Sequence, residues 1–168
     1  NGSDTQKTFY KSLEEAGISY NETLKEFYES SAKSGSGRPA NPAMTSGQRL
    51  PGFETGETPI ESYTADIVDS YVDYQDAAIV VFSRIGGEGF DLPRTMQSSF
   101  GGAAITGAAS PDSHYLELDA NEKALLEHVK ENFSNIIVVL NVGTTMEIPE
   151  LEADDEIDSI LWIGFPGA

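Results

Sequence analysis

A single carboxylate stands among glycines in residues 83–94, whose sequence is SRIGGEGFDLPR. Gly86, Gly87 and Gly89 surround Glu88. Glycines let the backbone turn sharply and approach a ligand closely. A Glu in such a loop can donate a proton if apolar surroundings raise its pKa. The same local pattern also fits a solvated turn residue, so Glu88 is a candidate general acid that needs further support.

Other motifs that could carry chemistry are weaker. The segment GSGRPA at 35–40 imitates a dinucleotide-binding turn, but it follows a predicted helix and Pro39 would interrupt the helix that must come next. The acidic segment EADDE at 152–156 lacks the spacing of a calcium-binding EF-hand loop. His114 and His128 are isolated and match no zinc-binding spacing. We therefore expect neither a cofactor nor a metal.

The composition narrows the possible partners. The chain has 168 residues, no cysteine and a formal net charge of −18. Such a negative surface repels nucleic acid and anionic lipid, whereas a neutral sugar meets no electrostatic barrier. No apolar run approaches the length of a membrane span. The composition leaves open whether the protein acts in the cytoplasm or is secreted.

Hydrophobic periodicity predicts alternating helices and strands. Helices are expected from a cap at Ser3 to a stop at Gly17, and from Asn21 onward. Further helices are expected over 65–73, over a segment opened by the capping box of Asp119 and Glu122, and near 146–151. Continuous apolar runs predict buried strands at 77–83, 135–142 and 159–164.

This alternation is typical of an α/β domain with a mainly parallel sheet and helices on both faces. We therefore predict a three-layer α/β/α sandwich and one domain over residues 1–168. Such sheets place ligands at the carboxyl ends of their strands. Glu88 follows the strand predicted at 77–83, so its loop lies at one of those ends.

The predicted domain looks incomplete. The two segments 33–61 and 84–113 are 29 and 30 residues long without periodicity, although structureless loops beyond about 15 residues are uncommon. A doubly wound sheet of three strands is also small. We expect at least one further strand, and a partner surface, outside this sequence.

Several segments resemble glycoside hydrolase family 3, the β-glucosidase family. DAAIVVFSRIGGEGFDLPR resembles the family's strand and the acidic, glycine-rich loop that follows it. LELDANEKALLEHVKENFSNIIVVLNVGTTMEI is similar to the helix, strand and turn that come next, and DSILWIGFPGA to the following strand. The opening NGSDTQKTFYKSLEEAGISYNETLKEFY is similar to the stretch after the family's first strand. Together these segments cover most of the chain in the family's order.

The resemblance implies that this chain is the sandwich domain of a retaining enzyme that also has a (β/α)₈ barrel. Glu88 would then be the general acid/base, and a barrel Asp would be the nucleophile. Arg84 and Asp91 would support Glu88 or contact a β-linked glucoside or oligosaccharide substrate. The loop departs from the family's pattern at two positions, since Gly86 replaces the family's Ser and Arg94 comes later than the family's Arg. The isolated chain is expected to be inactive.

Two other classes of function remain open. One is a non-catalytic carbohydrate-binding or domain-interface module, in which Glu88 is structural. The other is a flavodoxin-like or receiver domain, which would need a phosphate-binding turn or an acidic cluster with a Lys at the strand ends. Neither of these features is visible in the sequence.

Overall fold

The computed structural model describes residues 8–30, 38–39, 54–55, 57–84, 94–96 and 107–164. Its regular elements follow in chain order: α1 (Phe9–Glu15), α2 (Glu22–Ser30), β1 (Arg38–Pro39), β2 (Glu54–Thr55), the 3₁₀ helix η1 (Ile60–Ser62), α3 (Ala65–Asp69), the 3₁₀ helix η2 (Ser70–Asp73), β3 (Ala78–Arg84), α4 (Ala120–Asn132), β4 (Ile136–Val142), α5 (Pro149–Glu152) and β5 (Ser159–Trp162). Within the described ranges no helix is both long and apolar enough to cross a bilayer.

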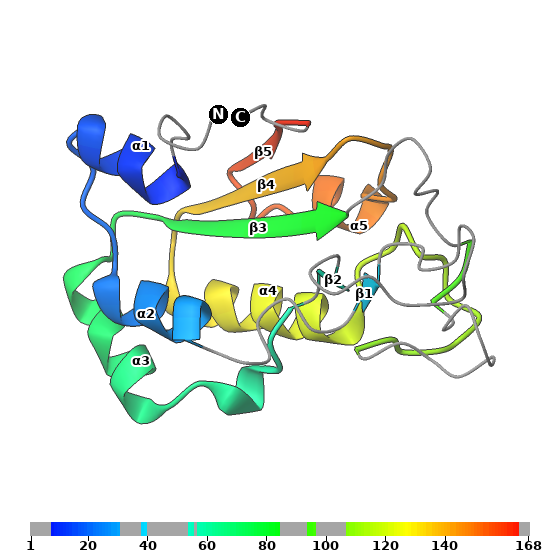
Figure 1. The fold of residues 1–168 in the computed structure, drawn as a ribbon, viewed down its shortest axis with the longest axis horizontal. Helices are drawn as coiled ribbons and strands as arrows, with labels where there is room; N and C mark the ends of the chain where they lie inside the picture. Colours follow the sequence, from blue (N-terminus) through cyan, green and yellow to red (C-terminus); the bar gives the residue numbers. More distant parts are fainter. Residues whose placement is uncertain are drawn as a thin grey trace, which may run out of the picture.

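The main sheet has three parallel strands in the order β3-β4-β5 (Figure 1). Ala78 pairs with Ile136 at one end of the first ladder, and Arg84 pairs with Val142 at the other. The parallel sheet and the α/β class predicted from the sequence are confirmed. Parallel strands need crossover connections, which α4 and α5 provide here.

The core lies between the sheet and α4. Alternate residues of β3, including Val80 and Phe82, are buried on the face that α4 covers. Val138 of β4 and Leu126 of α4 belong to the same cluster. Burial of aliphatic side chains of this size contributes about 1.5–3 kcal/mol each. The capping box predicted at the start of α4 is present, since the Asp119 side chain accepts a hydrogen bond from the Glu122 backbone N–H and the Glu122 side chain accepts one from the Asp119 backbone N–H.

The outer edge and the opposite face of the sheet are less covered. Ile79 and Val81 are 41% and 40% exposed, and Leu161 of β5 is 51% exposed. Among the described residues no strand pairs with the free edge of β3. The described part of the sheet therefore has partly exposed apolar side chains, and its β3 edge has no pairing strand among the described residues.

Local details differ from the sequence-based expectations. α1 begins at Phe9 with Thr8 as its N-cap, because the Thr8 hydroxyl accepts from the Lys11 N–H, whereas Ser3 was predicted to cap it. The helix predicted over 65–73 is divided into α3 and η2. The segment 33–61, predicted as loop, contains the short antiparallel pair β1–β2 and η1.

Candidate active site

The loop that carries Glu88 begins directly after β3. Glu88 and Asp91 both lie outside the described residues. Arg84 is the last residue of β3 and therefore lies at the carboxyl end of the parallel sheet, where ligands bind in folds of this type. The described structure thus fixes the residue four positions before Glu88.

Arg84 is buried, with only 1% of its surface exposed, and it is fully hydrogen-bonded. Its Nε donates to the Tyr115 carbonyl at 3.3 Å. Nη1 donates to the Ser83 carbonyl at 2.9 Å and to Glu122 Oε1 at 2.6 Å. Nη2 donates to the Glu117 carbonyl at 2.7 Å and to Glu122 Oε2 at 2.9 Å. These five acceptors match the five N–H donors of a guanidinium group.

This arrangement, which we call the Arg84 anchor, joins three parts of the fold. The bidentate contact with Glu122 ties the end of β3 to the first turn of α4. The carbonyl contacts tie the same point to the turn at 114–117. Since the five donors are already used within the described residues, Arg84 has the geometry of a residue that positions the loop, and direct contact with a substrate would require one of these bonds to break.

Trp162 stands near the same edge of the sheet. It is 66% exposed, although it lies in the apolar run of β5. Its indole N–H donates to the Val142 carbonyl at 2.6 Å, at the carboxyl end of β4. This bond fixes the ring while its surface remains open to solvent.

A partly buried carboxylate just before η1 was not recognised in the sequence. Glu57 accepts a hydrogen bond from the Tyr28 hydroxyl at 2.8 Å and from the Thr58 backbone N–H at 2.7 Å. The Tyr28 hydroxyl also contacts that of Tyr63. Burial raises the pKa of Glu57 to about 7, against these two hydrogen bonds, and the nearby charge of Glu122 adds to the rise. Glu57 lies in a Gly- and Pro-rich segment without periodicity, so only long-range contacts reveal its burial.

The raised pKa of Glu57 predicts that the stability of the fold falls as the pH rises. The carboxyl binds its proton more tightly in the folded state than in the unfolded state, where its pKa is 4.5. Its contribution to stability is therefore complete below pH about 4.5 and is lost as the pH rises through about 7. We expect the Tm of Glu57→Gln, relative to that of wild type, to be higher at pH 8 than at pH 5. An equal difference at both pH values would show that Glu57 is not buried as a neutral acid.

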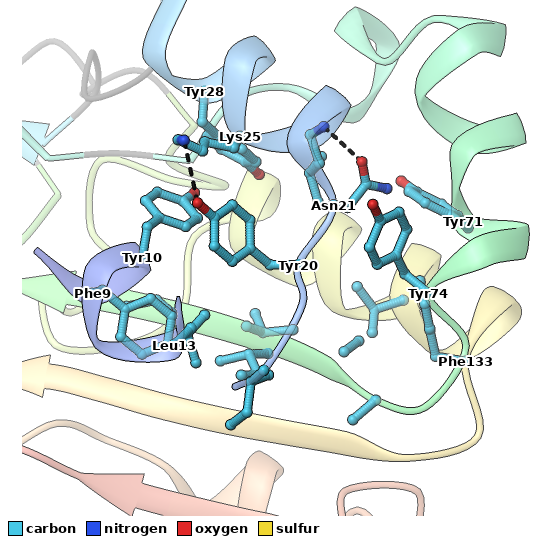
Figure 2. Close-up of a pocket in the computed structure, with 18 of the residues that line it drawn as sticks. Phe9, Tyr10, Leu13, Tyr20, Asn21, Lys25, Tyr28, Tyr71, Tyr74 and Phe133 are labelled. Carbon is cyan, nitrogen blue, oxygen red and sulfur yellow. Dashed lines mark hydrogen bonds between the residues drawn. The ribbon is translucent and has the colours of Figure 1, made fainter. Parts of the chain in front are cut away.

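A groove of about 780 Å³ runs along the free edge of β3. Residues on both faces of the strand line it, including the consecutive Ile79, Val80 and Val81. Aromatic rings from α1 and the residues after it lie on one side, and Tyr74 and Phe133 on the other (Figure 2). Lining by consecutive residues of one strand means that the groove follows the strand's edge, because successive side chains point to opposite faces.

Comparisons with known proteins agree on one family. Residues 4–168 match the model of the glycosyl hydrolase family 3 C-terminal domain. The chain is 35% identical over 106 residues to beta-glucosidase A of Butyrivibrio fibrisolvens. That match covers 59% of this chain and 13% of the relative, so the chain spans a small part of the relative's length. No solved structure gives a significant match.

The family model covers nearly the whole chain, and the parallel sheet has the helix and strand order that the sequence motifs indicate. The chain therefore belongs to glycoside hydrolase family 3, as a C-terminal domain of that family.

Proposed function

We propose that this domain supplies Glu88 as the general acid/base of a retaining β-glucosidase-type hydrolase. The nucleophile would be an Asp of a (β/α)₈ barrel in the same enzyme, and the substrate a β-linked glucoside or oligosaccharide. Support comes from the family match, from the relative named as a beta-glucosidase, and from the glycine-rich loop around Glu88. Since the domain holds one member of the catalytic pair, the isolated chain should not hydrolyse glycosides.

The observation that carries this proposal is the Arg84 anchor at the carboxyl end of β3. Arg84 is held by Glu122 and by carbonyl groups, so the main chain is fixed where the Glu88 loop begins. A proton donor must lie within hydrogen-bond reach of the leaving oxygen. A strand end fixed four residues before Glu88 would limit the range of positions that the Glu88 carboxyl group can occupy.

The proposed chemistry needs Glu88 to act twice. In retaining enzymes the two carboxyl groups lie about 5–5.5 Å apart, and the nucleophile forms a covalent glycosyl-enzyme. Glu88 would first protonate the leaving oxygen and then remove a proton from the water that hydrolyses the intermediate. Its pKa should fall once the nucleophile's charge has been neutralised, which suits this change of role.

Arg84 and Asp91 receive supporting roles in this proposal. Arg84 would position the loop through its buried contacts, without touching the sugar. Asp91 follows Glu88 by three residues in the same loop and would hydrogen-bond the loop or a sugar hydroxyl. The exposed Trp162 at the same sheet edge offers a ring on which a sugar could stack.

We also propose that a strand from another part of the same enzyme fills the groove along β3. The groove follows the strand's edge, its walls are largely aromatic and aliphatic, and most of the relative's length lies outside the matched region. An added strand would pair with the free backbone groups of β3 and cover Ile79 and Val81.

The proposed strand predicts a large loss of stability on substitution of Val81, whose side chain is 40% exposed in this structure. In the intact enzyme, Val81→Asp should lower the stability of the domain by at least about 2 kcal/mol, because the neighbouring side chains of the added strand would remove water from the new carboxylate. Val72→Asp is the matched control, since Val72 is 74% exposed on η2. Calorimetry of both variants measures the effect. Equal, small shifts in Tm would contradict an added strand.

The substitution Glu88→Gln in the intact enzyme tests the catalytic role. If Glu88 is the proton donor, the enzyme should lose turnover of cellobiose when this carboxyl becomes an amide. Unchanged hydrolysis would favour the alternative of a non-catalytic carbohydrate-binding or interface domain.

A further inference from the structure

One histidine and two glutamates, from the turn at 114–117 and from the segment after β4, meet at the surface beside the Arg84 anchor. Each of His114, Glu117 and Glu147 offers a ligand atom, and these atoms all lie within 4.8 Å of one another. His114 Nδ1 lies 2.8 Å from Glu147 Oε1 and 3.9 Å from Glu117 Oε1. The sequence showed no metal motif, because Glu147 is 33 residues from His114 and only the fold brings them together.

Main-chain hydrogen bonds hold the backbone of the three residues in place. The Glu147 N–H donates to the Leu116 carbonyl at 3.1 Å, which joins the segment after β4 to the turn at 114–117. The Glu117 N–H donates to the His114 carbonyl at 3.2 Å within that turn. His114 also forms a β-bridge with Thr95. A cluster fixed in this way needs little ordering when it binds a ligand.

The donor set fits a divalent transition metal. One imidazole nitrogen with carboxylate oxygens is a usual set for Zn²⁺, whereas Ca²⁺ and Mg²⁺ prefer oxygen ligands alone. Tetrahedral zinc with bonds of about 2.0–2.1 Å requires roughly 3.4 Å between ligand atoms. The two distances from His114 Nδ1, 2.8 and 3.9 Å, lie on either side of that value. Small side-chain rotations would therefore create the site.

We propose that His114, Glu117 and Glu147 bind one divalent transition-metal ion, with Zn²⁺ as the first candidate. Their side chains are 64%, 37% and 45% exposed, so an ion can reach them and water can complete the coordination. The two carboxylates, in a chain of net charge −18, attract a cation. The site is independent of the role proposed for Glu88.

Metal binding here would fasten the edge of the sheet from which the Glu88 loop leaves. The Glu117 carbonyl is an acceptor of Arg84, so the same turn carries a metal ligand and part of the Arg84 anchor. An ion shared with Glu147 would tie this turn to the segment after β4. The role assigned to the metal is to stabilise this edge, and the metal takes no part in the chemistry at the sugar.

The two histidines of this chain provide a matched experiment. The intact enzyme is stripped with a chelator and titrated at pH 8 with Zn²⁺ by calorimetry and with Co²⁺ by visible absorption. His114→Ala and Glu147→Gln remove one ligand each. His128→Gln is the control, because His128 lies on α4 with its Nε2 3.1 Å from the Tyr71 hydroxyl, away from the cluster.

Wild type and His128→Gln should each bind one more Zn²⁺ per chain than His114→Ala. If His114→Ala still binds this ion, its affinity should be at least about tenfold weaker. Zn²⁺ should raise the Tm of wild type and of His128→Gln, and raise that of Glu147→Gln less. Two outcomes would overturn the proposal: equal stoichiometry and affinity in all four proteins, or the same loss of binding in His128→Gln as in His114→Ala.

Discussion

Replacing Glu88 by Gln should slow hydrolysis of cellobiose by about 10²–10⁴-fold. The amide cannot donate a proton to the departing sugar, so a poor leaving group depends fully on the missing acid. An aryl glucoside with an activated leaving group needs little protonation and should form the glycosyl-enzyme almost normally. The ratio of kcat/KM between these two substrates, measured in the intact enzyme, reports the loss of the acid directly.

Azide provides a second test of the same residue. Without a general base, water attacks the glycosyl-enzyme slowly, whereas azide is already an anion and needs no base. Added azide should therefore restore turnover of the activated glucoside by Glu88→Gln and should leave the wild-type rate nearly unchanged. Glu131→Gln, an equivalent change at an exposed position of α4, should behave as wild type. No azide effect together with wild-type rates on cellobiose would refute the role of Glu88.

Replacing Arg84 by Met should be among the most destabilising single changes in this chain, at about 3–5 kcal/mol. The substitution leaves the buried carboxylate of Glu122 without its cation and leaves the carbonyls of Tyr115 and Glu117 without their donor. For a domain of this size that loss lowers Tm by roughly 10 °C. Calorimetry of the intact enzyme measures it, and turnover at low temperature should also fall because the start of the Glu88 loop is released.

Two further variants separate this effect from a general loss of charge. Lys123→Met breaks the ion pair with Glu150, whose partners are 47% and 46% exposed, and should cost no more than about 1 kcal/mol. The double variant Arg84→Met/Glu122→Gln removes the uncompensated buried charge, while the Gln can still accept from the Asp119 N–H. It should be more stable than Arg84→Met alone. If Arg84→Met and Lys123→Met lowered the stability equally, the buried contacts of Arg84 would contribute no more to stability than an exposed ion pair.

Elements whose signals are local could be predicted from the sequence. Apolar runs predicted the strands that became β3, β4 and β5, because apolar residues at successive positions are typical of strands in a parallel sheet. Burial on both faces was predicted for all three strands, but of these three only β4 is buried at most positions in the described structure. The spacing of Asp119 and Glu122 predicted the capping box of α4, since that contact spans three residues. The glycines around Glu88 identified it as a candidate general acid from local sequence alone.

The tertiary structure alone decided what depends on residues far apart in the chain. Arg84 forms its ion pair with Glu122 across a separation of 38 residues, and the fold buries both side chains. The pKa of Glu57 is raised because folding removes water from its carboxyl group, although the hydrogen bond from Tyr28 opposes this rise. His114 meets Glu147 in the same way. Burial and long-range proximity leave no periodic trace in sequence, because they arise only when separate elements pack together.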